Sequence, residues 1–196
     1  FVTGNTVIDA MRISPCRSEF CSPELRDVDF RRRVVTLTCH RRENYGEPME
    51  NIFSAVCELA KLHSELTFVY PEVKAAAVKN LGGVENIKLI SPLDAIDMRL
   101  LMSRSYMIMT DSGGLQEEAP ALGKPVLLLR RETERPEAVE AGTVRLCGVN
   151  RADIIREAEL LLTDSGAYER MAQAASPYGD GHASERIADA IIKHFG

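Results

Sequence analysis

Residues 106–120 read YMIMTDSGGLQEEAP, an apolar strand-like run that passes directly into a helix-like one. A strand followed at once by a helix is the repeating unit of a parallel sheet covered by helices. The paired glycines Gly113 and Gly114 allow another group to approach the backbone closely, and the first amides of the helix lack internal partners. Such a helix start is suited to binding an anion, with the Ser112 hydroxyl as an added donor. The alternative is an ordinary strand-to-helix turn in which Ser112 caps the helix.

Two positions in the helical part of this stretch strengthen the case for a site. Gly114 and Glu118 are four residues apart and share one helix face, so the Glu118 carboxylate would sit about one turn from a bound anion. In that place it could accept hydrogen bonds from the hydroxyls of a ribose. Pro120 falls inside the predicted helix and removes a backbone hydrogen bond, and residues that break such local rules tend to occur at functional sites.

Outward from this stretch, strand-like and helix-like segments alternate along most of the chain. Short apolar, β-branched runs predict six strands, at 34–38, 66–70, 86–90, 106–110, 125–129 and 143–146. Apolar residues at helical spacing, with start residues such as Pro48 and Asp94, predict helices at 48–63, 73–81, 94–104, near 112, 151–162, 167–174 and up to 194. This alternation predicts the α/β class, with a doubly wound parallel sheet covered by helices on both faces.

In such a sheet, ligands bind beyond the carboxyl ends of the strands, where the strand order reverses. Residues 39–44, CHRREN, place His40 and Arg41 at the end of the first strand, where they could hold a diphosphate by charge-assisted hydrogen bonds. The alternative there is a solvated loop with an Arg–Glu pair, and Arg135, after the fifth strand, could also be a solvated charge. Because three cationic or amide-rich loops share one edge of the sheet, we expect them to converge on one ligand.

Composition argues against several classes of protein. The chain of 196 residues has a net charge of −5 and only small basic clusters, so we expect no nucleic-acid partner. No apolar run approaches the roughly 20 residues of a membrane span, and no signal peptide opens the chain, so we expect no membrane partner. The missing initial methionine favours a fragment of a longer protein.

The cysteines and histidines predict neither a disulfide framework nor a metal centre. No CxxC pair occurs among the five cysteines, at positions 16, 21, 39, 57 and 147. Reduced thiols in the cytoplasm are the simplest interpretation. The four histidines, at 40, 63, 182 and 194, show no spacing typical of metal ligands, so we expect no metal.

Several short motifs become recognisable when they are taken together. They are HRREN at 40–44, DSGG at 111–114, QEEAP at 116–120, LGKPV at 122–126, TERPE at 133–137, AGT at 141–143, PYGDG at 177–181 and VTGNTVIDA at 2–10. With these motifs, essentially the whole chain resembles the non-hydrolysing UDP-N-acetylglucosamine 2-epimerases. The resemblance implies two Rossmann-like domains in the GT-B-like arrangement shared with many glycosyltransferases, with the active site in the cleft between them.

Within that arrangement, residues 1–196 resemble the second, C-terminal domain. Residues 1–12 would be the crossover segment from the first domain, and residues 176–196 would carry the closing helix. The resemblance thus implies that the N-terminal domain is absent from this chain. It also implies that the full-length protein is a cytoplasmic homodimer without a cofactor that acts in polysaccharide biosynthesis.

The resemblance further implies a UDP site. The residues implied to bind the UDP-sugar substrate are His40, Arg41, Met98, Ser112, Gly113, Gly114, Glu118 and Arg135. The glycines and Ser112 would hold the diphosphate, Glu118 would bind the ribose, and Arg135 would contact the nucleotide. Many relatives carry an aromatic residue near the uracil, where this chain has Met98, whose polarisable side chain can still cover a base.

One segment departs from the family pattern. After Pro71, relatives continue with a loop that contains a histidine, an asparagine and a proline, and this chain is several residues shorter there. Either the loop is truly short or residues are missing from this sequence. The intact strand and helix that flank the loop favour the second interpretation.

The implied reaction inverts C2 of the sugar. UDP is eliminated to leave an enol-ether sugar, and is then added back with C2 protonated on the opposite face. The acids and bases usually assigned to this step are carboxylates of the absent first domain, and His40 is the candidate catalytic residue of this chain. We therefore expect the fragment to be inactive alone. Two alternatives stay open: a sugar-nucleotide glycosyltransferase domain, and a nucleotide-binding module without catalysis.

Overall fold

The computed structural model describes residues 1–14, 17–72 and 75–196. Within these ranges, six parallel strands form one sheet in the order β3-β2-β1-β4-β5-β6. The strands are β1 (Arg33–Thr38), β2 (Leu66–Tyr70), β3 (Ile87–Leu89), β4 (Met107–Thr110), β5 (Val126–Leu128) and β6 (Val144–Leu146). The strand order reverses beside β1, which pairs with β2 on one side and β4 on the other. The predicted doubly wound sheet is confirmed.

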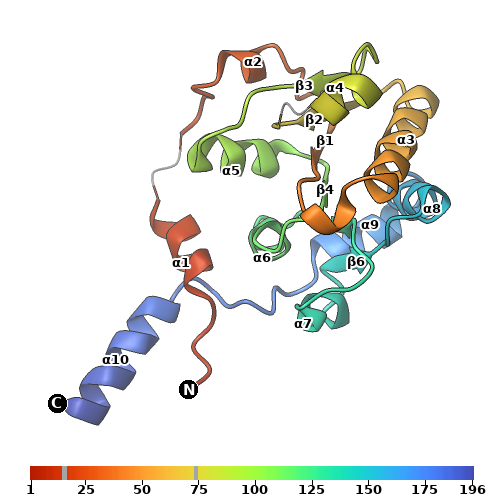
Figure 1. The fold of residues 1–196 in the computed structure, drawn as a ribbon. Helices are drawn as coiled ribbons and strands as arrows, with labels where there is room; N and C mark the ends of the chain where they lie inside the picture. Colours follow the sequence, from red (N-terminus) through yellow and green to blue (C-terminus); the bar gives the residue numbers. More distant parts are fainter. Residues whose placement is uncertain (15–16, 73–74) are drawn as a thin grey trace.

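Helices cover both faces of the sheet, because the side chains of each strand point alternately to the two faces. In β1, Val35 and Leu37 lie in the core on one face, and Val34 lies in a core on the other. The first face carries α3 (Glu47–Leu62), α4 (Ala75–Leu81), α8 (Arg151–Thr163) and α9 (Ser165–Ala172). The second carries α5 (Ala95–Arg104), α6 (Leu115–Ala121) and α1 (Thr6–Ile13). Figure 1 shows α5, α6 and α1 to the left of the sheet, and α3 and α8 to its right.

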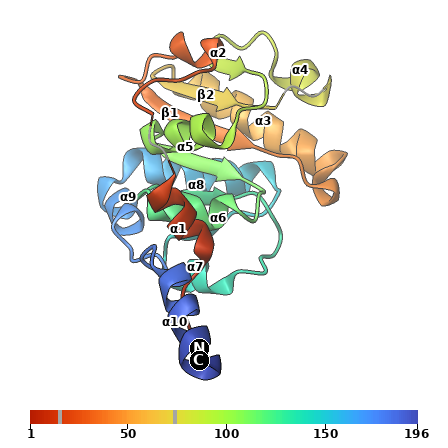
Figure 2. The ribbon, with the colours of Figure 1, turned by 90° about the vertical axis from the view of Figure 1, so that its left-hand side faces the viewer.

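The N-terminal segment and the segment before α10 (Ala183–Phe195) cross each other and are tied together. The Asn5 amide donates to the Tyr178 carbonyl at 2.8 Å. The buried carboxylate of Asp9, on α1, accepts from the first amides of α10, at 3.0 and 2.7 Å. From this joint, α10 projects away from the body of the fold (Figures 1 and 2).

Several short elements depart from the sequence-based prediction. The predicted crossover segment contains α1, and α2 (Pro23–Arg26), η1 (Arg42–Asn44) and α7 (Pro136–Glu140) are additional. Elements of three to five residues are too short to show an apolar period, so the sequence pattern does not reveal them.

One predicted helix begins later than expected, and the predicted start of another falls outside the described residues. The helix expected from near Ser112 begins at Leu115, after Gly114, because the two glycines continue the turn, and Ser112 therefore does not cap it. Pro120 lies near the end of this helix, where it interrupts little of it. The start predicted at Val73 lies outside the described residues, and so does Cys16.

Across the described ranges, no helix combines the length and apolar character that crossing a membrane requires.

Candidate functional site

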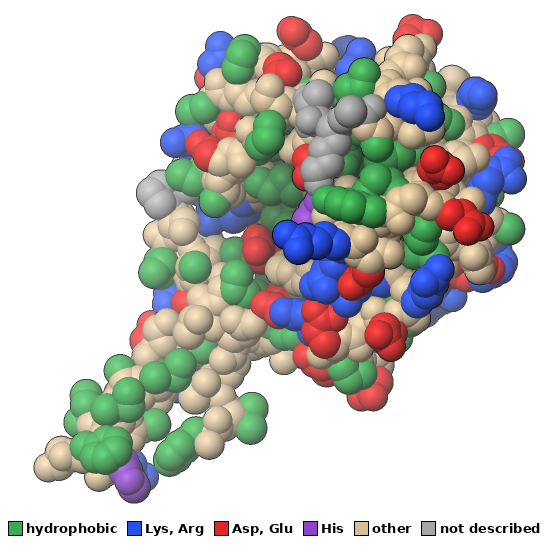
Figure 3. Space-filling model, viewed as in Figure 1, with side chains coloured by type: hydrophobic (Ala, Val, Ile, Leu, Met, Phe, Trp, Pro, Cys, Tyr) green, Lys and Arg blue, Asp and Glu red, His purple; other side chains and the backbone are tan. Residues whose placement is uncertain are grey.

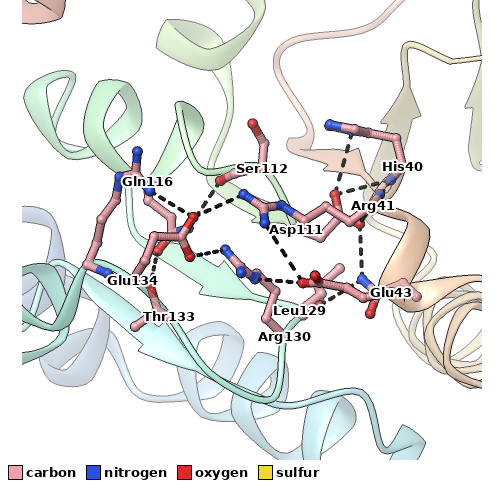
Figure 4. A network of polar contacts seen from close by, with 12 residues as sticks. His40, Arg41, Glu43, Asp111, Ser112, Gln116, Leu129, Arg130, Thr133 and Glu134 are labelled. Atoms are coloured by element: carbon pink, nitrogen blue, oxygen red, sulfur yellow. Dashed lines mark hydrogen bonds and ion pairs between the residues drawn. The ribbon is translucent and has the colours of Figure 1, made fainter.

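The carboxyl ends of β1 and β4 lie side by side where the strand order reverses. Thr38 and Thr110 are partners in the parallel ladder, and their hydroxyl oxygens lie 2.5 Å apart. Beyond them, the loop with His40 and Arg41 faces the turn 111–114 (Figure 4). A reversal of this kind is the usual place for a ligand in a parallel sheet.

Asp111, the first residue after β4, holds the surrounding loops together. Its fully buried carboxylate accepts from the backbone amides of His40, at 2.9 Å, and Arg41, at 2.8 Å. The Asn44 side chain donates to the same carboxylate, at 3.0 Å, and to the Leu129 carbonyl after β5, at 3.1 Å. Because a buried carboxylate without donors costs free energy, these bonds fix the backbone under the site.

Two arginine side chains lie directly over the backbone of Gly113. A Cβ atom at this position would come within 3.0 Å of Arg135 Nη1 and 3.2 Å of Arg41 Nη2, so glycine leaves the room that both groups occupy. Arg41 follows β1 and Arg135 precedes α7, so loops from the two strands that flank β4 converge here. Two guanidinium groups in this place are suited to holding phosphate oxygens.

Carboxylates contact these arginines in the structure. Glu134 lies 3.1 Å from Arg41 Nη2, 3.0 Å from Arg135 Nη1 and 2.6 Å from Arg130 Nη1. Arg130 is buried and also donates to Glu43, at 3.1 Å. The pKa of Glu134 falls to about 2, through a hydrogen bond with its own backbone amide and ion pairs with Arg130 and Arg41. Figure 4 shows the Glu134 carboxylate between the Arg41 and Arg130 guanidinium groups, and Figure 3 shows acidic and basic side chains intermingled on this face.

Glu117, on α6, holds the other edge of the Arg135 guanidinium. Arg135 Nε donates to one oxygen of Glu117, and the Asn5 side chain donates to the other at 2.7 Å. The Thr133 hydroxyl lies 2.8 Å from Gln116 Oε1 and accepts from the Arg135 amide at 3.1 Å. The loop before α7 is therefore anchored to α6, and the N-terminal segment reaches the site through Asn5.

A pocket of about 370 Å³ opens beside the arginines. It lies between the ends of β1, β2 and β4 and the start of α5, and Figure 3 shows this face hollowed near its centre. His40 borders it with Nδ1 3.6 Å from an Asp111 oxygen and 3.9 Å from a Glu72 oxygen. Leu93 and Met98 line the apolar wall, which is suited to the face of a nucleobase.

Glu118 faces a second, smaller cavity behind Gly114. Its Oε1 lies 3.4 Å from the place of a Cβ atom on Gly114, which confirms that the two residues share one helix face. Burial raises the pKa of the Glu118 carboxyl, and the neighbouring charge of Glu117 raises this pKa further. The cavity is also lined by α1 and by Arg99 of α5, the helix whose Met98 lines the pocket of His40.

The structure brings together most of the residues predicted to bind substrate. Around Gly113 lie Arg41, Ser112, Gly114 and Arg135, with His40 and Met98 around the adjoining pocket. Their roles stay predictions. Asp111, Glu117 and Glu134 were not predicted as individual contributors to the site, although all three fall within the motifs. Among the residues that the structure describes, no group of three or more His, Cys, Asp or Glu side chains could hold a metal ion.

Comparison with known proteins gives one consistent family. The family model for UDP-N-acetylglucosamine 2-epimerase matches residues 1–192. The UDP-N-acetylglucosamine 2-epimerase of Bacillus subtilis is 47% identical over 201 residues, which cover 100% of this chain and 52% of that protein.

Solved structures agree with the sequence comparison. The S. aureus MnaA–UDP co-structure has a TM-score of 0.90 and 45% identity, over 98% of this chain and 53% of that one. UDP-GlcNAc 2-epimerase from Neisseria meningitidis, solved bound to UDP-GlcNAc, has a TM-score of 0.87 and 41% identity, over 98% of this chain and 55% of that one. This chain therefore spans about half the length of the relatives it matches.

Proposed function

This chain belongs to the UDP-N-acetylglucosamine 2-epimerase family, and on that premise we propose that it is the UDP-binding half of an enzyme that converts UDP-N-acetylglucosamine into UDP-N-acetylmannosamine. The observation that carries the proposal is the convergence of Arg41 and Arg135 over Gly113, at the ends of β1 and β4. The likeness to an epimerase bound to UDP-GlcNAc supports the substrate class.

In this proposal each part of the nucleotide has a partner. The diphosphate lies on the backbone of Gly113 and Gly114, between the two guanidinium groups and the Ser112 hydroxyl. The uracil covers Met98, and the ribose hydroxyls donate to the Glu118 carboxylate. That carboxylate lines a cavity, and in its ionised form it can accept such hydrogen bonds.

The chain contributes to the reaction by stabilising the departing UDP. When the bond from C1 of the sugar to the diphosphate oxygen breaks, its electron pair stays on that oxygen. Arg41 and Arg135 stabilise this charge by hydrogen bonds that strengthen as the bond breaks. His40, with its backbone fixed by Asp111, borders the pocket beside the two arginines and is the candidate for proton transfer within this chain.

A base must remove the proton from C2. We expect this base in the part of the full-length protein that this chain, which covers about half of its relatives, does not include. We therefore propose that the chain alone binds UDP and does not epimerise. The homodimer, the cytoplasmic location and the role in polysaccharide biosynthesis stay predictions. A glycosyltransferase domain and a non-catalytic module are weaker candidates, because relatives at 41–47% identity are named as epimerases.

Calorimetric titration of this chain with UDP, with UMP and ADP as controls, tests the proposed site. We expect saturable binding that is weaker for UMP, which lacks the second phosphate, and weaker for ADP, which carries adenine in place of uracil. Equal affinity for all three nucleotides would contradict a site built for uracil and diphosphate.

Two substitutions test the residue assignments. Ser112→Ala and Arg135→Ala should each weaken UDP binding by about 1.5–3 kcal/mol, the usual contribution of a hydrogen bond to a charged group. Arg131→Ala removes the same charge from an exposed position in the same loop and should leave affinity nearly unchanged. If Arg131→Ala and Arg135→Ala lose affinity equally, only the net charge of the loop matters and the assignment is wrong.

A further inference from the structure

Glu134 occupies the arginine nitrogen atoms that a diphosphate at this site would need. It contacts Nη2 of Arg41 at 3.1 Å and Nη1 of Arg135 at 3.0 Å. These are the two nitrogen atoms that lie over Gly113. A carboxylate oxygen and a phosphate oxygen compete for the same donors in the same geometry. The Glu134 carboxylate therefore stands where part of the ligand's charge would be.

We propose that Glu134 is an internal counter-anion, which the diphosphate of the ligand displaces from Arg41 and Arg135 and which returns when the ligand leaves. This inference rests on the UDP-binding function proposed above and adds a residue that sets the affinity of that site.

The surroundings of Glu134 allow such an exchange. Its side chain is 46% exposed, so it can turn toward solvent without disturbing a core. Arg130, which is buried, holds the second carboxylate oxygen at 2.6 Å, and this ion pair can persist after the other two arginines are lost. The Thr133 hydroxyl contacts the Gln116 side chain and accepts from the Arg135 amide, which anchors the loop on both sides of Glu134.

The charge balance of the cluster points the same way. Three guanidinium groups, of Arg41, Arg130 and Arg135, are matched by three carboxylates, of Glu43, Glu117 and Glu134. The three arginines are therefore matched in charge within the cluster, and each has a carboxylate partner without an external anion. Because the diphosphate must displace Glu134 from the arginines, its net binding free energy is smaller than its direct interactions with them would give. Such a balance limits affinity and favours release of the nucleotide.

The test compares Glu134→Gln with Glu132→Gln. Glu132 is an exposed residue two positions earlier in the chain, so its substitution removes the same charge from a solvated side chain. Each protein is titrated with UDP and with inorganic pyrophosphate, and its thermal unfolding is measured without ligand. We expect Glu134→Gln to bind both ligands about tenfold more tightly than the unaltered chain, and Glu132→Gln to change affinity less than about twofold. We also expect Glu134→Gln to unfold at a lower temperature, because it loses three ion pairs.

Tighter binding together with lower stability supports the inference, because a merely structural role would weaken both. Weaker binding in Glu134→Gln would show that the residue only positions the arginines, and an effect equal to that of Glu132→Gln would show long-range charge alone; both overturn it. If the unaltered chain binds UDP and Glu134→Gln binds no tighter, the inference fails and the proposed function stands. If neither protein binds either ligand, the proposed function fails and the inference fails with it.

Discussion

The half-buried carboxylate of Glu118 lies behind Gly114 and beside the charge of Glu117. Its pKa is raised mainly by burial and further by the charge of Glu117. Only the ionised form is a pure acceptor for ribose hydroxyls, and a raised pKa means that protonation begins at a higher pH than for an ordinary carboxyl group. We therefore expect UDP affinity to begin to fall at a higher pH, as the solution is acidified, than an ordinary carboxyl group at this place would cause.

Glu118→Gln should flatten that pH dependence and bind UDP more weakly at pH values that leave the Glu118 carboxylate ionised. Calorimetric titration at several pH values measures both effects. Titration of the diphosphate itself is common to both proteins and cancels in the comparison. An unchanged pH profile in Glu118→Gln would remove Glu118 from the ribose site.

At the residue scale, the sequence pattern revealed positive and small residues better than their acidic partners. Gly113 and Arg135 stood out because the loops that carry them share one edge of the sheet with the loop of His40 and Arg41. Glu134 did not, because a glutamate in an exposed loop resembles any solvated charge until its three arginine partners are seen. The anchoring role of Asp111 could have been predicted, because an aspartate directly after a buried strand needs several hydrogen-bond donors.

Two glycines meet where the N-terminal segment crosses the segment before α10. Gly179 has a φ of 105°, and a Cβ atom there would lie 3.1 Å from Gly4 Cα. The nearby hydrogen bond from Asn5 to Tyr178 prevents the two backbones from separating. Gly179→Ala should therefore combine backbone strain with a backbone clash and destabilise the chain by about 2–3 kcal/mol.

Gly142→Ala is the matched control, because Gly142 has a φ of 78° but nothing within 4 Å of the added carbon. It should cost about 1 kcal/mol, from strain alone. Chemical denaturation of both variants measures the difference. Equal losses would mean that the crossing is loose enough to admit a methyl group.

At the element scale, whether a helix or strand was predicted correctly depended on its length and its apolar content. The observed strands end within one residue of the predicted ones, because short β-branched runs bounded by polar loops have few alternatives. The helix α1 was read as a crossover segment, although Asn5 caps it by accepting from the Val7 amide at 3.0 Å. Capping was visible there, but eight residues carry barely two turns of periodicity.

At the scale of the whole molecule, α10 presents large apolar side chains to solvent near its C-terminal end. Ile191, Ile192 and Phe195 are 54%, 67% and 81% exposed. Exposed apolar patches of this kind promote association. We expect this chain to self-associate at high concentration, and replacement of all three residues by serine to reduce the association seen by sedimentation.

The same triple substitution should change the free energy of unfolding by less than about 0.5 kcal/mol per residue, because exposed side chains contribute little to stability. Asp189→Ser, at an exposed polar position of the same helix, is the control and should leave association unchanged. A large loss of stability in the triple variant would show that α10 packs on the body of the fold in solution.

The order of the strands also determines when the site can come into existence as the chain folds. Val34 in β1 pairs with Thr67 in β2, 33 residues away, but Val35 pairs with Met107 in β4, 72 residues away. Distant pairings carry a larger loop-closure entropy and tend to form slowly. Since His40 and Arg41 follow β1 while Ser112 and Gly113 follow β4, the nucleotide site exists only once this central seam has closed. Nucleotide binding during refolding would therefore report on the closing of that seam, and a chain whose two half-sheets have formed separately would bind nothing.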